Sequence, residues 1–278
     1  MNIQQWIGRV ETRTDLVTAA PIAGLSATLD RDDPGPKVGD PLPPLWHWLY
    51  FLPASRQSEL GPDGHTARGG FLPPVELPRR MWAGSRLEFV KPLRVGDEIT
   101  RVSTIKDIQE KSGRSGPLVF ITVRHEISTD AGLAVVDEHD IVYRGDAKPG
   151  DHQPTPLAAP TDQHWERIIH PDEVFLFRYS ALIFNGHRIH YDRPYVTEVE
   201  GYPGLIVHGP LIATLLMDLV RRSLPNANVA KFAFRAVSPL FDIAPFSVCG
   251  KTESDGRTVK LWAKNATGGL AMEATAIL

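Results

Sequence analysis

The most informative stretch of this chain is Phe184-Asn185-Gly186-His187-Arg188-Ile189-His190-Tyr191-Asp192, followed by Gly204-Leu205-Ile206-Val207-His208-Gly209-Pro210. The first segment brings an amide, two imidazoles and a carboxylate close together in the sequence. In the second, Pro210 opens an apolar segment, and proline suits the first turn of a helix because an N–H there needs no intrahelical partner. An amide and a histidine beside a helix N-terminus indicate a site that activates water and holds a carbonyl oxygen.

The segment 210–223 is the clearest helix in the sequence. Thr214 and Asp218 are expected on its polar face together with the last-turn residues Arg221 and Arg222, whose positive charges stabilise the negative end of the helix dipole. The opposite face is a broad apolar stripe at helical spacing, made of Leu211, Ile212, Leu215, Leu216, Leu219 and Val220.

The two halves of the chain are similar to each other. Segments 86–93 and 233–240 each read as an apolar strand that ends in Pro-Leu, and they lie about half the chain length apart. Segments with the alternation of half-buried antiparallel strands follow, at 118–127 in the first half and at 258–264 in the second. Each half then ends in another extended apolar segment, at 134–143 and 270–278. One helix with a broad apolar face, followed by several antiparallel strands, predicts the α+β class, with a curved sheet wrapped on a central helix in each half.

The first half differs from the second in its helical region. Segment 44–52 is shorter and more aromatic than 210–223, and no His-Gly pair leads into it. We therefore expect the first half to keep the shape of the fold without its chemistry. A polar segment rich in proline and glycine, 145–156, separates the two halves, and a second loop-like segment spans 31–41.

Composition excludes several classes of protein. Hydrophobic residues make up 42% and charged residues 23%, which is typical of a soluble globular chain, and the net charge of -3 argues against a general nucleic-acid binder. The one cysteine, Cys249, excludes an intramolecular disulfide and a cysteine-rich metal cluster. No apolar run approaches the ~18 residues that span a bilayer, and the first residues lack the features of a secretory signal. We expect a cytoplasmic protein.

The residue types near position 190 suit the addition of water to an enoyl thioester. This reaction needs a base for the water and a group that stabilises negative charge on the thioester oxygen. Histidine is a suitable base because its usual pKa of about 6.5 leaves it largely neutral at physiological pH. We expect His190 to be this base, Asn185 to orient the water, and the N–H of Gly209, at a helix N-terminus without an obstructing side chain, to hold the oxygen.

Two other interpretations of these histidines remain open. A histidine in a loop is more often a surface residue or a hydrogen-bonded structural residue than a catalytic one. His187 and His190, with Asp192 and His208 nearby, also raise the possibility of a metal site. A His-x-x-His pair in a loop, however, specifies no complete tetrahedral ligand set, so we favour a site without metal.

Segments 180–192 and 206–209 resemble the hydratase motif of MaoC-like, (R)-specific enoyl-CoA hydratases, which have the hotdog fold. In that family an acidic residue and a histidine five positions later activate water, and the glycine of a His-Gly pair donates its N–H to the thioester carbonyl. The resemblance places the histidine at His190, the glycine at Gly209 and the acid at Asn185. An amide cannot transfer protons as an acid does, so His190 is expected to do the proton chemistry while Asn185 positions the water.

The variant of the motif and the chain length look like a two-domain branch of that family. The branch contains mitochondrial type 2 hydroxyacyl-thioester dehydratases and bacterial mesaconyl-CoA and itaconyl-CoA hydratases. Segments 64–74 and 78–85 resemble the degenerate first hotdog of these proteins. The resemblance implies a double hotdog, in which residues 1–150 form a degenerate N-terminal hotdog that walls the acyl and CoA tunnel. Residues 155–278 would form the catalytic hotdog.

The resemblance also implies an activity. It indicates a hydro-lyase that reversibly adds water to an α,β-unsaturated acyl-CoA, with a small dicarboxylic substrate such as itaconyl-CoA or mesaconyl-CoA. One alternative is a 3-hydroxyacyl-thioester dehydratase of fatty-acid metabolism that acts on CoA or acyl-carrier-protein esters. Two further alternatives are a hotdog thioesterase, for which Asp218 is the available carboxylate, and a non-catalytic acyl-thioester binding protein.

The implied ligand is the acyl-CoA substrate, with no metal and no cofactor. Because CoA carries phosphates and a dicarboxylic acyl group carries a carboxylate, arginines are expected to bind it, ideally with bidentate geometry. The candidate substrate-binding residues are His187, His208, Arg188, Arg79 and Arg80. No nucleic acid and no membrane is expected as a partner, and both a monomer and a homodimer fit the resemblance.

Overall fold

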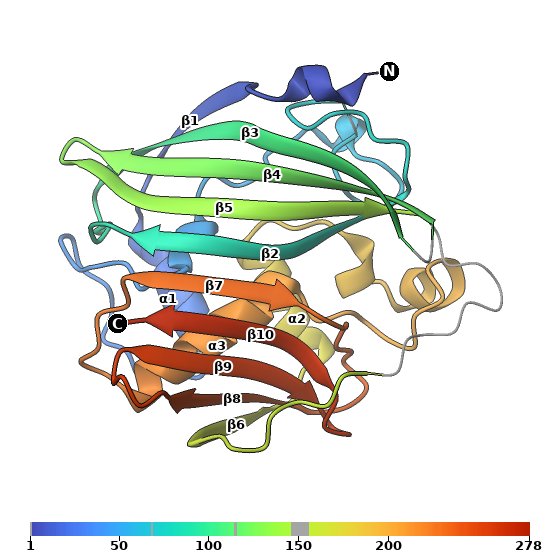
Figure 1. Ribbon diagram of the computed structural model, residues 1–278. Helices are drawn as coiled ribbons and strands as arrows, with labels where there is room; N and C mark the ends of the chain where they lie inside the picture. Colours follow the sequence, from blue (N-terminus) through green and yellow to red (C-terminus); the bar gives the residue numbers. More distant parts are fainter. Residues whose placement is uncertain (1, 68, 114–115, 146–155) are drawn as a thin grey trace.

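The computed structural model describes residues 2–67, 69–113, 116–145 and 156–278, and these form ten strands in one antiparallel sheet (Figure 1). The strands are β1 (Val10–Leu16), β2 (Arg79–Phe89), β3 (Glu98–Gly113), β4 (Gly116–Thr129), β5 (Gly132–Arg144), β6 (Trp165–Ile169), β7 (Lys231–Ala236), β8 (Phe246–Thr252), β9 (Thr258–Asn265) and β10 (Leu270–Ile277). The α-helices are α1 (Ala19–Thr28), α2 (Glu173–Leu182) and α3 (Gly209–Ser223). Shorter helical turns are η1 (Ile3–Trp6), η2 (Trp46–Leu49), η3 (Gln57–Glu59), η4 (Arg188–His190) and η5 (Tyr195–Val199).

The strand order confirms the similarity of the two halves. It runs β1-β3-β4-β5-β2-β7-β10-β9-β8-β6, which is symmetrical about the contact between β2 and β7. These two central strands contain the first part of each matching segment predicted from the sequence, residues 86–89 and 233–236. Ser85 of β2 lies opposite Phe234 of β7. The α+β class is therefore confirmed, and the two curved sheets join edge to edge into one. Of the predicted linker 145–156, residues 146–155 lie outside the described residues.

The α-helices lie on one side of the sheet, as Figure 1 shows. The predicted helix at 210–223 is confirmed as α3, whereas α1 and α2 were not expected. The sequence of α1 contains Pro21 and Gly24, which are poor helix formers. A Cβ on Gly24 would lie 2.8 Å from Leu182 Cδ2 of α2, so α1 packs closely against α2 at this position. Among the described residues, no helix combines the length and the apolar character needed to cross a membrane.

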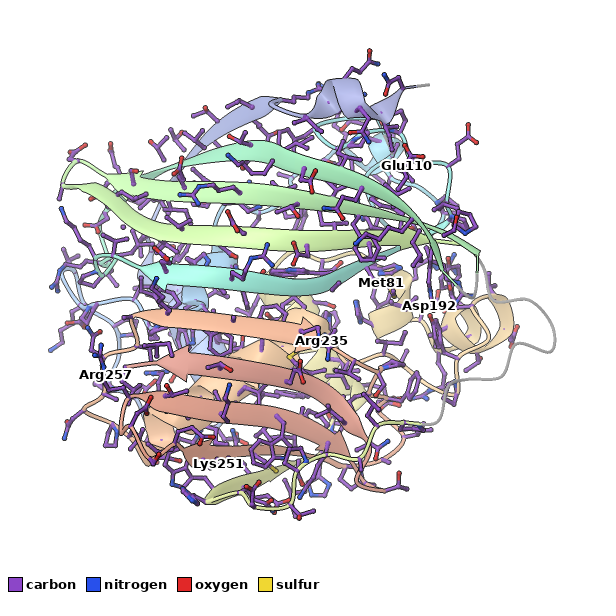
Figure 2. All side chains as sticks on the ribbon, viewed as in Figure 1. Met81, Glu110, Asp192, Arg235, Lys251 and Arg257 are labelled. Carbon is purple, nitrogen blue, oxygen red and sulfur yellow. The ribbon has the colours of Figure 1, made fainter. Side chains whose placement is uncertain are left out.

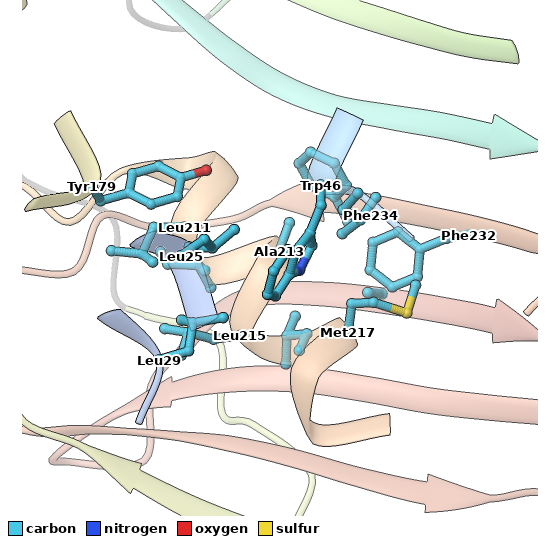
Figure 3. Close-up of a cluster of buried hydrophobic side chains, with 14 of the residues drawn as sticks. Leu25, Leu29, Trp46, Tyr179, Leu211, Ala213, Leu215, Met217, Phe232 and Phe234 are labelled. Carbon is cyan, nitrogen blue, oxygen red and sulfur yellow. The ribbon is translucent and has the colours of Figure 1, made fainter. Parts of the chain in front are cut away.

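The core gathers around α3. Every residue of α3 from Leu211 to Val220 is buried, so the predicted place of Thr214 and Asp218 on a polar face was wrong. The reason is that α3 is enclosed by both halves of the chain: Figure 3 shows its apolar side chains among those of α1, η2, α2 and β7. The residues drawn there include Leu25, Leu29, Trp46, Tyr179, Leu211, Ala213, Leu215, Met217, Phe232 and Phe234. In the first half, segment 44–52 holds only the short η2, as its length predicted.

Asp218 lies at the centre of a buried group of ion pairs. Its predicted place on the polar face of the helix had indicated a surface position, which was wrong. Its side chain is 0% exposed, and its oxygens accept from Arg31 Nη1 at 2.5 Å, Arg167 Nη1 at 3.1 Å and Arg222 Nε at 2.7 Å. Arg31 belongs to the first half, so this cluster fastens the loop after α1 onto α3. A carboxylate with three arginine partners is stable in the interior. If the carboxylate were removed, the arginines would keep partly buried positive charges without a partner, which is unfavourable.

Replacing Asp218 with Asn should therefore destabilise the protein strongly. The variant would leave three partly buried arginines without their anion, and removing one partner of a buried ion pair costs about 3–5 kcal/mol. The free energy of unfolding in urea measures the effect, and Asp32→Asn, at an exposed position, is the matched control. A loss for Asp218→Asn no larger than that of the control would contradict this account.

Candidate active site

His190 is a buried, neutral imidazole, and among the described residues only one of its ring nitrogens has a hydrogen-bond partner. It ends η4 and is 7% exposed, and its Nδ1 donates to the backbone oxygen of Ile206 at 2.7 Å. The pKa of His190 is lowered to about 3. Burial is the main cause, and the neighbouring His187 adds to the effect. With the proton held on Nδ1, Nε2 presents a lone pair, which is the state that a general base requires.

His208 supports the ring of His190 from behind. The two rings stack with centroids 3.6 Å apart and planes 17° apart. His208 is 1% exposed, and its Nε2 shares a hydrogen bond of 2.8 Å with Ser180 Oγ of α2. Within the part of the chain that the structure describes, its Nδ1 is buried without a hydrogen-bond partner. His208 was a candidate for substrate binding, and this placement suits a supporting role.

Gly209 begins α3 directly after His208. In the described ranges its N–H has no hydrogen-bond partner, as is usual for the first residues of a helix. A Cβ at this position would have as its nearest neighbour the backbone oxygen of Trp82, 3.9 Å away on β2. The N–H of Gly209 follows directly on His208, whose ring stacks on His190, and a free N–H at a helix N-terminus suits an anionic oxygen.

Asn185 shapes the loop that carries the histidines. Its Oδ1 accepts from the backbone N–H of His187 at 3.0 Å, and its own N–H donates to the oxygen of Ser180 at 2.8 Å. The preceding residue, Phe184, has a φ of 50°, so the chain leaves α2 through the left-handed region. Among the described residues, the side-chain nitrogen of Asn185 has no partner and remains able to bind water.

A loop of the first half packs on this same segment. Asp63 Oδ2 and His65 Nδ1 are 3.0 Å apart, and the ring centroid of His65 lies 3.9 Å from that of His187. Gly64 has a φ of +87°, and a Cβ on it would lie 1.9 Å from the oxygen of Gly186, so only glycine fits. The first half thus brings a carboxylate and an imidazole to the site, which its sequence did not lead us to expect.

The donor atoms that could bind a metal ion are not those considered from the sequence. Atoms of Asp63, His65 and His187 lie within 4.8 Å of one another. Asp192 instead accepts from Arg188 and from the N–H of Tyr195.

Two of the three candidate arginines have their charges paired. Arg188 forms an ion pair with Asp192 at 2.8 Å and lies over the ring of Tyr195 at 4.1 Å. Arg79 donates to Tyr202 Oη at 2.9 Å and lies 3.6 Å from a carboxylate oxygen of Glu200. Both contacts fasten segments near the site, and neither guanidinium is free for a phosphate.

Arg80 is the cation that remains available. It lies on β2, is half-buried, and is close enough to His187 for its charge to lower the pKa of that imidazole. In the described residues its side chain has no ion pair or hydrogen bond. An unpaired, half-buried guanidinium beside the reactive imidazoles is a suitable binding group for an anion.

Two tryptophans of the first half line the side of the candidate site that lies opposite Gly209. The rings of Trp48 and Trp82 are 5.0 Å apart, and Trp82 lies 4.1 Å from the ring of His139. Asp137 holds this wall in place, since one of its oxygens accepts from Trp48 Nε1 at 2.8 Å and contacts His139 Nε2 at 2.7 Å. Burial would raise the pKa of Asp137, but its histidine partners hold it well below the usual range. This buried polar cluster was also missed, although Asp137 and His139 interrupt the apolar face of a predicted strand.

Comparison with known proteins agrees with the geometry. The profile of the family described as hydroxyacyl-thioester dehydratase type 2 matches residues 45–242. The chain is 47% identical over 273 residues to mesaconyl-C(4)-CoA hydratase of Chloroflexus aurantiacus, covering 97% of this chain and 95% of that protein.

Solved structures of low sequence identity share the fold. HtdX of Mycobacterium tuberculosis is 20% identical with a TM-score of 0.64, over 96% of this chain and 99% of that one. A second protein of Mycobacterium tuberculosis, described as having a double hotdog fold, is 15% identical with a TM-score of 0.57, over 98% and 96% of the two chains. The double hotdog expected from the sequence is thereby confirmed.

Acidification should destabilise the protein through His190. Its folded-state pKa of about 3 lies below the value of about 6.5 for an unfolded histidine. As the pH falls below about 6.5, the unfolded chain binds a proton at this histidine that the folded site does not bind. The free energy of unfolding is therefore highest above about pH 6.5 and decreases as the pH falls toward about 3. Between about pH 7.5 and about pH 5, wild type should lose about 2 kcal/mol more unfolding free energy than His190→Gln.

Urea unfolding at the two pH values makes this comparison. His170→Gln is the control, since His170 is exposed and should keep the wild-type pH dependence. An equal loss in wild type and His190→Gln would show that His190 is not held neutral by the fold.

Proposed function

The chain belongs to the hydroxyacyl-thioester dehydratase type 2 family, and we propose that it is a hydro-lyase that reversibly adds water to an α,β-unsaturated acyl-CoA. The observation that carries this proposal is the juxtaposition of two groups: a buried neutral His190 with Nε2 free, and the unpartnered N–H of Gly209 at the start of α3. These are the base and the oxyanion donor that the addition of water requires.

The residues assign a role to each step. Water near His190 and the side-chain amide of Asn185 loses a proton to His190 Nε2 while its oxygen bonds to the β-carbon. The electron pair of the double bond moves to the thioester oxygen, where the N–H of Gly209 stabilises the charge. The His190 imidazolium then returns the proton to the α-carbon. Dehydration follows the same steps in reverse.

We propose a small dicarboxylic enoyl-CoA as the substrate, with mesaconyl-C(4)-CoA first and itaconyl-CoA second. The similarity to a mesaconyl-C(4)-CoA hydratase over nearly the whole chain supports this choice. The free guanidinium of Arg80, beside His187, supplies a partner for the carboxylate that such an acyl group carries. Dehydration of a 3-hydroxyacyl thioester in fatty-acid metabolism is the alternative that the family description supports.

The structure argues against the thioesterase alternative, because its candidate carboxylate, Asp218, is not available for catalysis. A thioesterase needs a carboxylate free to attack or to activate water at the thioester carbon. Asp218 is fully buried and bonded to three arginines, so it cannot serve. We further propose a cytoplasmic location, with which the free, buried Cys249 is consistent, and either a monomer or a homodimer as the active form.

The activity is tested by the loss of enoyl-thioester absorbance with crotonyl-CoA, a long-chain 2-enoyl-CoA, mesaconyl-C(4)-CoA and itaconyl-CoA. We expect turnover to be fastest with a dicarboxylic ester, and His190→Gln to lower kcat by about 100- to 10,000-fold because it removes the general base. His170→Gln should retain full activity. Binding of the esters without turnover in wild type would favour the non-catalytic alternative.

Arg80 should determine the preference for a dicarboxylic substrate. A hydrogen-bonded charge pair contributes about 1.5–3 kcal/mol, so Arg80→Gln should lower kcat/KM for mesaconyl-C(4)-CoA by about 10- to 100-fold. The value for crotonyl-CoA, which has no second carboxylate, should change little. Arg257→Gln is the control: Figure 2 shows Arg257 at one end of the molecule and Asp192, near the site, at the other. Equal losses on both substrates would exclude carboxylate recognition by Arg80.

A further inference from the structure

An aromatic group with members from both halves of the chain borders the start of α3. The ring centroids of Trp48 in η2 and Trp82 in β2 are 5.0 Å apart. Phe234 of β7 lies 6.2 Å from the first ring and 5.9 Å from the second. We call these three residues the aromatic wall. It lies close to the proposed oxyanion donor, because the backbone oxygen of Trp82 is the nearest neighbour of a Cβ placed on Gly209, at 3.9 Å.

Two members of the wall keep exposed surface on the inner side of the sheet. Trp48 and Trp82 are half-buried, whereas Phe234 is 6% exposed. The ring of Trp82 points inward, because its Nε1 donates to the Oγ of Ser85, a residue that is only 1% exposed. The preceding residue, Met81, is 39% exposed, as alternation along a strand requires. The exposed surface of these indole rings therefore lies on the side of the sheet that holds the helices.

A buried carboxylate fixes the orientation of Trp48. Oδ2 of Asp137, a residue of β5 that is 1% exposed, accepts from Trp48 Nε1 at 2.8 Å. The same oxygen contacts His47 Nε2 at 3.2 Å and His139 Nε2 at 2.7 Å. Because Asp137 is ionised, the indole N–H donates to a charged acceptor, and such hydrogen bonds are stronger than neutral ones.

Trp82 is fixed by its own hydrogen bonds and by one of these histidines. Its Nε1 donates to the backbone oxygen of Gly84 at 2.9 Å and to Ser85 Oγ at 3.0 Å. The ring of His139, which contacts Asp137, lies 4.1 Å from the indole with the planes 36° apart. A ring that is both hydrogen-bonded and packed cannot move aside for a longer ligand without breaking these contacts.

The short turn η2 gains a role from this arrangement. Where the second half forms α3, segment 44–52 of the first half forms only η2, and this turn supplies both Trp48 and His47. One of them belongs to the aromatic wall, and the other contacts the carboxylate that holds the wall. The aromatic character of the segment therefore serves the shape of the site.

Strand β2 runs along the reacting part of the proposed substrate. Trp82 lies next to Gly209, and Arg80 is close enough to His187 to act on its pKa. Arg80 and Trp82 are two residues apart, so alternation places their side chains on the same face of β2. With the thioester oxygen on Gly209 and the β-carbon at His190, a substituent of the β-carbon would extend along this face.

We propose that the aromatic wall limits the length of the acyl group, with Trp82 as the specificity-determining residue and Asp137 as the positioning residue that holds Trp48. This inference rests on the proposed function. A carboxylate carried directly by the β-carbon reaches Arg80, whereas a chain of several more CH2 groups meets the wall. The site therefore takes short enoyl-CoA esters, and long-chain esters are poor substrates because of their shape.

The test compares kcat/KM for trans-2-octenoyl-CoA with kcat/KM for crotonyl-CoA. Neither acyl group carries a carboxylate, so the ratio of the two values reports chain length and not recognition by Arg80. In Trp82→Ala the ratio of octenoyl to crotonyl should rise by about 10- to 100-fold, because each CH2 that gains an apolar site favours the longer ester by about fourfold. Trp82→Phe, which keeps an aromatic ring, should stay near the wild-type ratio.

Asp137 is tested through the ring that it holds. Trp48→Phe keeps an aromatic ring but lacks the N–H that Asp137 accepts, so the ratio should rise, by less than in Trp82→Ala. Asp137→Asn should change the ratio in the same direction and also lower Tm. A structural role alone would instead lower Tm and the activity on both esters equally, with the ratio unchanged.

Trp6→Ala is the matched control. Trp6 is half-buried like Trp82, but it lies in η1, ahead of the edge strand β1, where Arg9 covers its ring at 4.2 Å (Figure 1). This variant should leave the ratio unchanged whatever its effect on Tm. If Trp82→Ala does not fold, Trp82→Leu makes the same comparison with a larger apolar side chain.

Two outcomes would overturn the inference while the proposed function stands. One is a Trp82→Ala variant that still hydrates crotonyl-CoA at an unchanged ratio. The other is a wild-type protein that hydrates trans-2-octenoyl-CoA as well as crotonyl-CoA. A wild-type protein inactive on every ester, including the dicarboxylic ones, would overturn the proposed function, and this inference with it.

Discussion

The antiparallel pairing of β2 with β7 is the contact on which the site depends. It joins the two halves into one sheet, and Gly84 permits the close approach because a Cβ there would lie 2.4 Å from the oxygen of Phe234. The same strand β2 then carries Trp82 to face Gly209 and Arg80 to lie near His187. In our account the first half is therefore a structural part of the candidate site.

Burial explains both the reactivity of the site and its need for charge. Burial keeps His190 neutral, and in the described part of the chain its Nε2 has no partner, which suits a base. The same burial makes the protonated state of His190 unfavourable. In our account Arg80 offsets the charge that a dicarboxylic substrate would bring.

Much of the fold and half of the site could be predicted from the sequence, because both have local signals. The helical spacing of apolar residues identified α3, alternation identified β4 and β9, and extended apolar segments identified β5 and β10. The segment 184–209 contains the candidate residues His190, Asn185 and Gly209. The burial of Asp218 and the approach of Asp63 and His65 to His187 depend on contacts between distant segments, and no local pattern marks them. The two missed helices, α1 and α2, lack a strong apolar stripe and are held by tertiary packing.

The most direct test of the central claim, that both halves build one acyl-thioester site, is a crystal structure with the saturated analogue of mesaconyl-C(4)-CoA. The account predicts the thioester oxygen within hydrogen-bond distance of Gly209 N, the β-carbon near His190 Nε2, and the acyl carboxylate on Arg80 of the first half. An acyl group bound away from Gly209, or contacting only residues of the second half, would contradict it.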